Sequence, residues 1–275
     1  MLIPIFAQYK FNLNFNVLKF QDIYEVRSET GDNLALIGYL YNWLAKVIIP
    51  VLIAFSLIKK HKLLTIFGVS VLLYLFIAQA HKSVFFGIII VLFFYFIKNY
   101  YKKITFFIII LLLVFISTHI LTYTTGIYAP ESILIRRVFF VPALLNTYYF
   151  DFFDQNYIYL SHSIFKNFLT YPFDVPPPAV IGMEYFNSEA TNANNGFISD
   201  GFMNFGYFGV ILYSILVVIL FKFFDILRLD SRYFGIFFVI IFTLISSAFL
   251  TSLLTHGILV LILLAIFIMQ NQKNK

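Results

Sequence analysis

The sequence predicts an all-α, polytopic membrane protein with about seven transmembrane helices and one large outer loop that carries an amphipathic helix. Of its 275 residues, 61% are hydrophobic and only 12% are charged, and the mean hydropathy is +0.90. Soluble domains carry roughly 25% charged residues. Lipid is the solvent in which so much apolar surface needs no polar covering. The chain contains no cysteine, which excludes disulfide bonds, thiolate metal sites and a cysteine nucleophile.

Apolar segments recur at the length that a bilayer requires, which is about 20 helical residues. We predict membrane spans near 38–58, 63–80, 83–98, 104–122, 207–224, 233–250 and 254–270. The third segment is short, but Lys98 and Tyr100 can extend it by reaching the interface. Residues 1–37 then form an outer N-terminal segment, and residues 1–275 are expected to form a single membrane domain.

The lysines and arginines of the loops predict the orientation of these spans, because cytoplasmic loops carry an excess of basic residues. With the basic hairpin 59–62 in the cytoplasm, the inner side holds eleven basic and two acidic residues, a net charge of +9. The outer side holds seven basic and eleven acidic residues, a net charge of −4. We therefore expect the N-terminus outside and the C-terminus in the cytoplasm. The positive charge is explained by topology, so no nucleic-acid partner is expected.

The outer loop, residues 123–206, is the one long segment between the predicted spans. An apolar stripe over 132–145 predicts an amphipathic helix, which Ser132 could cap and which Pro142 is expected to kink or end. An aromatic run over 148–159 suits the headgroup region of a bilayer. We expect the loop to lie on the membrane surface as a half-buried lid.

Four cations on the outer side are candidates for binding an anion. Arg136 and Arg137 lie on the predicted amphipathic helix, where a buried arginine is costly and its planar fork matches phosphate or pyrophosphate. Arg27, just before the first span, and Lys82, at the start of the third, could reach the same anion. The alternatives are contact with ordinary lipid phosphates for the arginine pair, a neighbouring glutamate for Arg27, and the interface for Lys82.

The candidates for a general base on the outer side are His256, His162 and Asp200, because histidine or a perturbed carboxylate serves near neutral pH. A purely structural role is the alternative for each. Lys46 lies within the first span and either extends to the interface or faces a cavity and meets an anionic headgroup. The histidines lack metal-ligand spacing and no P-loop occurs, so no metal and no cofactor are expected.

Several segments together resemble a known family. They are 22–27 (DIYEVR), 136–143 (RRVFFVPA) and 194–201 (NNGFISDG), with 81–83 (HKS) and 255–257 (THG) at helix ends. On these segments the chain resembles the Wzy-type oligosaccharide repeat-unit polymerases, which make O-antigen or capsule. The resemblance extends from about residue 22 through most of the chain. Members of that family usually have more spans, so we expect further helices to precede Met1.

The resemblance implies glycosyl transfer at the outer face of the bacterial cytoplasmic (inner) membrane. The substrate would be an undecaprenyl-pyrophosphate-linked oligosaccharide, and a hydroxyl of an incoming lipid-linked unit would attack the anomeric carbon. Arg136 and Arg137, then Arg27 and Lys82, would bind the pyrophosphate, and His256, His162 or Asp200 would act as the base.

The alternatives are an O-antigen ligase, which uses the same donor, and a non-enzymatic lipid-linked sugar flippase or scaffold. The lipid bilayer itself is an expected partner. So are a flippase and a chain-length regulator of the same pathway.

Overall fold

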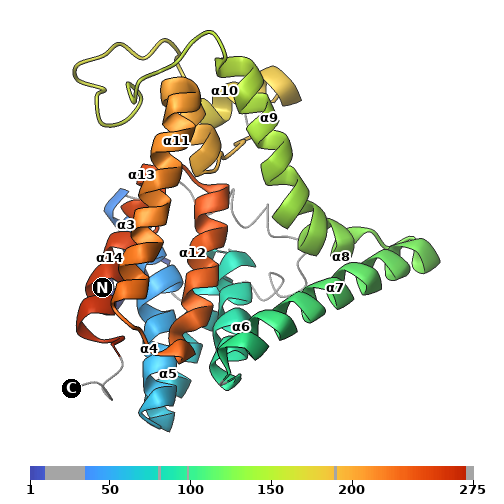
Figure 1. Cartoon of the computed structure of the whole chain (residues 1–275), viewed down its shortest axis with the longest axis vertical. Coiled ribbons are helices and arrows are strands. Elements are labelled where there is room, and N and C mark those ends of the chain that lie inside the picture. Colours follow the sequence, from blue (N-terminus) through green and yellow to red (C-terminus); the bar gives the residue numbers. More distant parts are fainter. Residues whose placement is uncertain (10–34, 80–81, 98, 189–190, 271–275) are drawn as a thin grey trace. The chain divides into compact units, whose positions relative to one another are not determined.

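The computed structural model describes residues 1–9, 35–79, 82–97, 99–188 and 191–270 (Figure 1). All the regular elements in these ranges are helices. In chain order they are α1 (Leu2–Tyr9), α3 (Ala35–Trp43), η2 (Leu44–Ile48), α4 (Ile49–Ile58), α5 (Lys62–Gln79), α6 (Lys82–Phe96), α7 (Tyr100–Thr125), α8 (Ala129–Glu131), η3 (Ser132–Phe140), α9 (Val141–Phe153), α10 (Pro177–Phe186), α11 (Phe197–Ile226), η4 (Ser231–Tyr233), α12 (Phe234–Ser246), α13 (Phe249–Leu253) and α14 (Ile258–Phe267). The predicted all-α class is confirmed for the described residues.

Five helical segments of the described chain are long and apolar enough to cross a membrane. They are Leu36–Ile58, Lys62–Gln79, Tyr101–Thr125, Ala129–Phe153 and Phe197–Ile226. Three shorter apolar helices, Val84–Phe96, Ser231–Ser246 and Ile258–Phe267, correspond to the third, sixth and seventh predicted spans. These helices indicate a multi-pass membrane protein, while the number of seven spans stays a prediction. The segment Ala129–Phe153, which we expected on the membrane surface, is the least apolar of the five.

Pro142 does not end the helix over Ser132–Phe140, which was one of the two predicted outcomes. The chain stays helical to Phe153, because Pro142 is the second residue of α9. The first turn of an α-helix tolerates proline, since its backbone N–H has no partner within the helix there. The preceding segment η3 is a π-helix, and the N–H of Val141 donates to the carbonyl of Arg136 five residues back. The proline therefore lies where one helical form replaces the other.

The described chain divides into two compact units. Unit 1 comprises Met1–Tyr100, Phe223–Ile241 and Leu250–Lys275, and unit 2 comprises Tyr101–Lys222 and Phe242–Phe249. In unit 1, α4 and α5 pack side by side (Figure 1), and a Cβ on Gly68 would lie 2.8 Å from Cγ1 of Ile53. The hydroxyl of Tyr41 donates to the carbonyl of Leu75 at 2.9 Å within the same core. Glycine at this crossing allows the two helices to approach closely.

In unit 2 the aromatic segment after Pro142 forms a core rather than an exposed belt. Tyr149 and Phe153 of α9 are fully buried, and the hydroxyl of Tyr149 donates to the carbonyl of Ala193 at 2.9 Å. The ring of Phe150 stacks on Phe202 of α11, with centroids 4.0 Å apart. These contacts join α9 to the first part of α11.

The helix α11 is not straight, since Phe205 and Gly206 leave the helical region. Gly206 has φ +62°, which favours glycine. A Cβ on Gly209 would lie 1.9 Å from the carbonyl oxygen of Gly201, so the two arms of the bend touch through their backbones. The predicted fifth span begins at residue 207, directly after this bend.

Candidate functional site

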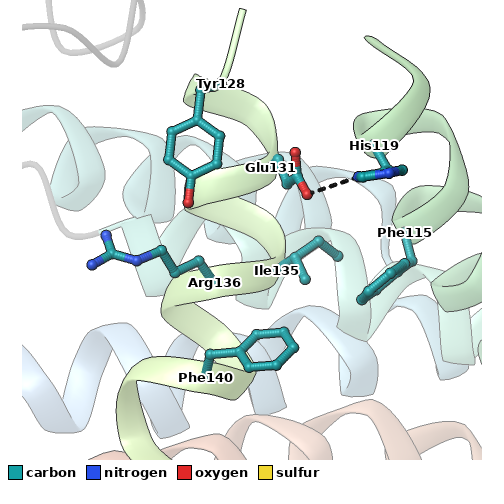
Figure 2. A pocket seen from close by; sticks show the side chains of 7 residues that line it. All are labelled: Phe115, His119, Tyr128, Glu131, Ile135, Arg136 and Phe140. Carbon is teal, nitrogen blue, oxygen red and sulfur yellow. Dashed lines mark hydrogen bonds and ion pairs between the residues drawn. The ribbon is translucent and has the colours of Figure 1, made fainter. Parts of the chain in front are cut away.

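A pocket of about 480 Å³ opens in unit 2 between α7 and the α8–η3 segment (Figure 2). It is lined by Phe115, His119, Tyr128, Glu131, Ile135, Arg136 and Phe140. Most of this wall is apolar or aromatic, and three side chains can carry charge. Its volume and composition are those of a site for a small molecule or part of a larger one.

The turn between α7 and α8 builds one end of this pocket. Gly126 has φ +72° and its N–H donates to the carbonyl of Thr122 at 2.9 Å, so α7 ends at a glycine in the left-handed region. Pro130 follows within the first turn of α8, where its fixed φ suits a helix start. This short turn brings Glu131 back to the last turns of α7.

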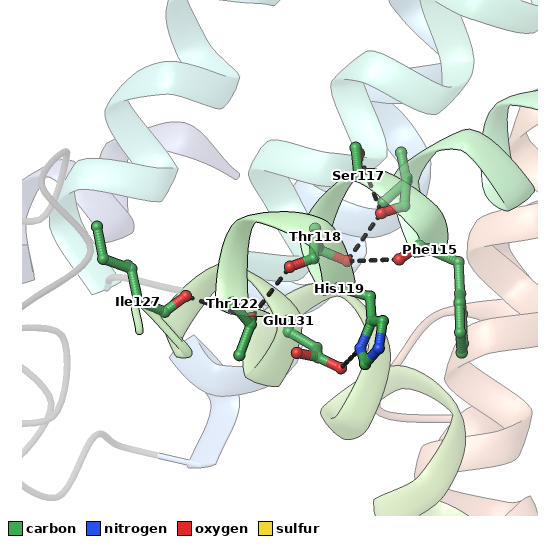
Figure 3. Close-up of polar contacts among 8 residues, drawn as sticks. Phe115, Ser117, Thr118, His119, Thr122, Ile127 and Glu131 are labelled. Carbon is green, nitrogen blue, oxygen red and sulfur yellow. Dashed lines mark hydrogen bonds and ion pairs between the residues drawn. The ribbon is translucent and has the colours of Figure 1, made fainter. Parts of the chain in front are cut away.

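The threonines near the end of α7 bond to carbonyls of their own helix, and Thr122 also donates to the carbonyl of Ile127 in the turn that follows, at 3.3 Å (Figure 3). The hydroxyl of Thr118 donates to the carbonyl of Val114 at 2.8 Å, and that of Thr122 donates to Thr118 at 3.0 Å. Such bonds satisfy a hydroxyl in apolar surroundings. The helix can therefore carry polar residues at its end while the rest of its surface stays apolar and exposed.

His119 and Glu131 form a pair at the edge of the pocket, with Nδ1 3.2 Å from Oε1 (Figures 2 and 3). The side chain of His119 is 68% exposed and that of Glu131 is 21% exposed. Neither residue was among the predicted site residues. His119 lies within the predicted span 104–122, and Glu131 lies twelve residues further on. The Gly126 and Pro130 turn was the sequence signal that could have connected them.

The two neighbouring arginines are not equivalent in the structure. Arg136 lines the pocket, whereas Arg137 is not among the lining residues, and both are exposed. Consecutive residues on a helix point about 100° apart, so adjacent side chains do not share a face. Arg136 therefore lines the same pocket as His119 and Glu131, with its guanidinium pointing away from that pair (Figure 2).

His256, a predicted base, lies in unit 1 and contacts Lys46. Nδ1 of His256 is 2.7 Å from Nζ of Lys46 and 3.3 Å from Oδ1 of Asn42. Lys46 belongs to the π-helical turn η2, and the neighbouring indole N–H of Trp43 donates to the carbonyl of Leu254 at 2.6 Å. Lys46 is thus hydrogen-bonded within the protein. His256 is followed by Gly257, which has φ +83° and is the N-cap residue of α14.

Asp200, another predicted base, is almost fully buried in unit 2 and both its oxygens accept hydrogen bonds. Oδ2 accepts from the backbone N–H of Phe249 at 2.8 Å, and Oδ1 accepts from the amide of Asn204 at 3.1 Å. Oδ1 of Asn204 in turn accepts from the N–H of Leu160 at 2.7 Å. This geometry favours a structural role, because the carboxylate joins the start of α13 to α11. Its catalytic role stays a prediction.

His162, the third predicted base, lies against Tyr171 in the loop after α9, with ring centroids 6.0 Å apart. Its Nδ1 is buried and has no hydrogen-bond partner among the residues that the structure describes. Burial lowers the pKa of His162 and raises the pKa of Tyr171. His162 is therefore held in its neutral form.

The two remaining predicted cations cannot be placed in the site. Arg27 lies outside the described residues, and Lys82 is described only as the first residue of α6, without its side chain. Among the described residues, no group of three or more histidine, aspartate or glutamate side chains could hold a metal ion.

The sequence matches no known family and no curated protein, and no solved structure is similar to the fold. The family resemblance of the sequence therefore stays a prediction, and the function is argued from the geometry.

Proposed function

We propose that the chain polymerises undecaprenyl-pyrophosphate-linked oligosaccharide repeat units into a surface polysaccharide, on the outer face of the bacterial cytoplasmic membrane. The observation that supports this most is Arg136 in an aromatic-walled pocket of a protein built from apolar helices. A lipid-linked substrate needs an enzyme in the bilayer, and its pyrophosphate needs a cation near the interface.

The reaction forms negative charge on the departing pyrophosphate as the bond to the anomeric carbon breaks. A guanidinium neutralises that charge and can bind two phosphate oxygens at once. Arg136, which η3 carries into the pocket lining, would take this role, and Arg137, Arg27 and Lys82 would add charge around it. Positioning and charge neutralisation account for most of the catalysis in such transfers.

The walls of the pocket support a sugar-bearing substrate. Phe115, Tyr128 and Phe140 offer aromatic surface, and the few polar groups are concentrated at His119, Glu131 and Arg136. Small-molecule sites combine apolar and aromatic walls with a few placed polar groups in this way.

A lipid-linked sugar flippase is a second candidate, and the pair Lys46 and His256 favours it. Lys46 lies within a membrane-length helical segment, and His256 contacts it from the turn before α14. Ionisable residues within membrane segments often mark a substrate or ion pathway. A flippase would depend on this pair, whereas the polymerase would depend on Arg136.

Replacing Arg136 and Arg137 with alanine, singly and together, in the native strain tests the polymerase. We expect Arg136→Ala to convert the ladder of surface polysaccharide on a gel to a single repeat unit. Arg136→Lys, which keeps the charge and removes the planar fork, should give a shortened ladder. Lys166→Ala, an exposed cation of the same loop, is the matched control, and the amount of protein in the membrane is measured for each variant.

The other outcomes separate the alternatives. Loss of all attached sugar in the variant indicates that the chain is a ligase or a flippase. If it is a flippase, loss of its activity also leaves the lipid-linked units on the cytoplasmic side. An unchanged ladder in the double variant, with normal protein levels, overturns the assignment of the arginines.

A further inference from the structure

We propose that His119 is the general base of the transfer reaction and that Glu131 is its positioning residue. The inference rests on the proposed function, because it takes the hydroxyl of an incoming lipid-linked unit as the substrate. It stands on three observations: a cavity, a histidine–carboxylate pair at its edge, and a guanidinium lining the same cavity.

The partner of His119 determines which ring nitrogen can take a proton. An ionised carboxylate only accepts hydrogen bonds, so Nδ1 of His119 carries the proton that it donates to Oε1 of Glu131. The lone pair is then on Nε2. Within the described chain no other side chain is hydrogen-bonded to this imidazole. Nε2 is therefore a basic nitrogen that a substrate hydroxyl can reach, because His119 is 68% exposed.

Glu131 gives this imidazole the support that a base requires. A carboxylate on Nδ1 fixes the tautomer and ring orientation and stabilises the imidazolium that forms when Nε2 takes a proton. Glu131 is held by the first turn of a helix, directly after Pro130, so its position follows from the backbone. It touches His119 and need not touch the substrate.

His119 and Arg136 line one pocket, the first from α7 and the second from η3. The acceptor hydroxyl gives its proton to Nε2 of His119, and its oxygen forms the new bond to the anomeric carbon. The bond from that carbon to the pyrophosphate oxygen breaks, and the electron pair leaves with undecaprenyl pyrophosphate, which Arg136 neutralises. The imidazolium then releases its proton to water. Both bond changes need groups within one pocket, and His119 and Arg136 line the same one.

The test uses the full chain in proteoliposomes, with undecaprenyl-pyrophosphate-linked repeat units from a strain that lacks this chain as the probe. His119→Asn is the decisive variant, because its amide N–H can still donate to Glu131 while the basic nitrogen is gone. We expect kcat to fall by about 10²–10⁴-fold, with a small change in KM. Glu131→Gln should lower kcat by about 10–100-fold.

His61→Ala is the matched control, because His61 is an exposed histidine of the hairpin between α4 and α5 in unit 1. It should keep the rate of the wild type. Thermal melting in detergent tests whether His119→Asn is folded. The reaction rate of His119→Ala is then compared with that of His119→Asn. If the asparagine restored the rate that alanine removes, the role of His119 would be structural and the proposal would be overturned.

The proteoliposome assay gives one result if the assignment of the base is wrong and another if the proposed function is wrong. If the wild type lengthens the probe and His119→Asn does so equally well, the base assignment falls and the polymerase stands. If the wild type in folded form does not lengthen the probe, both fall.

Discussion

Each of the two units contains a histidine whose Nδ1 contacts a charged side chain, but the partners have opposite character. In unit 2, His119 contacts a carboxylate, Glu131, at the edge of a pocket. In unit 1, His256 contacts a lysine, Lys46, within a membrane-length helix. The sequence drew attention to His256 and not to His119.

The character of the partner determines what each imidazole can do. A carboxylate accepts the Nδ1 proton and leaves a lone pair on Nε2 of His119. The amine of Lys46 can donate to Nδ1 of His256, which then accepts and has its proton on Nε2. The shorter distance to Lys46, 2.7 Å against 3.3 Å to Asn42, favours this arrangement. A neutral histidine whose lone pair is already bonded is a poor base, so the comparison favours His119.

The largest expected difference between the two sites is in catalytic rate. His256→Asn keeps an oxygen that can accept from Lys46, so the rate should stay close to that of the wild type. His119→Asn should lower it by about 10²–10⁴-fold. The measurement is extension of lipid-linked repeat units in proteoliposomes. If His256→Asn lost the rate and His119→Asn kept it, the comparison would be reversed and His256 would be the base.

The next largest expected effect is on the free energy of unfolding. It concerns Asp200, which the sequence also predicted as a general base. Asp200→Ala removes the acceptor of the Phe249 N–H and of the Asn204 amide, and each bond to a charged group contributes about 1.5–3 kcal/mol. We expect a loss of about 3 kcal/mol in the free energy of unfolding, measured in detergent, while exposed Asp174→Ala loses little. A loss of rate at full stability would instead support catalysis by Asp200.

A smaller difference in the free energy of unfolding is expected between variants of His256 and variants of His119. His256→Leu removes an acceptor from Lys46 inside a membrane-length helix and should cost about 1–3 kcal/mol. His119→Leu, at an exposed pair, should cost less than about 1 kcal/mol. The double variant Lys46→Met with His256→Leu should recover most of the loss, because no buried cation then remains. Equal losses at the two sites, measured by melting in detergent, would show that burial does not distinguish them.

The smallest effect is a pH dependence from His162. Its pKa is lowered by burial in the folded protein, so the unfolded chain binds the proton more readily. The free energy of unfolding should therefore fall as the pH decreases below about 6.5, the ordinary pKa of histidine. His162→Phe should reduce that slope in melting curves recorded at several pH values. An unchanged slope would show that His162 is solvated in the folded state.

Much of the fold follows from the sequence, because an apolar run of bilayer length has few other stable forms. The helix from Ser132 was predicted, whereas the start of a span at residue 207, next to the bend at Gly206, stays a prediction. Pro142 does not end the helix as the sequence suggested, because it lies in the first turn of α9, directly after the π-helical turn. No sequence pattern specified that turn.

The site was harder to predict, because its pairs depend on turns and on helix faces. Adjacent arginines suggested one binding group, yet only Arg136 lines the pocket. His119 was missed because the apolar pattern included it in a span, and its partner becomes visible only after the turn at Gly126. Asp200 was predicted as a base, but it accepts from a backbone N–H whose approach the sequence does not reveal.

The π-helix over Ser132–Phe140 determines how the pocket side chains are rotated about the helix axis relative to α9. Removing one residue from it would change that rotation. A π-helical segment holds one more residue per hydrogen-bonded ring than an α-helix, so deleting a residue within it would restore α-helical bonding. Residues before the deletion would then rotate by about 100° around the axis relative to α9. If the deleted residue lay between Glu131 and Ile135, Glu131 would turn relative to Ile135 and Arg136, although every pocket residue was still present. The extra residue of the π-helix thus determines how the charged side chains of the pocket are rotated about the helix axis relative to the buried aromatic side chains of α9.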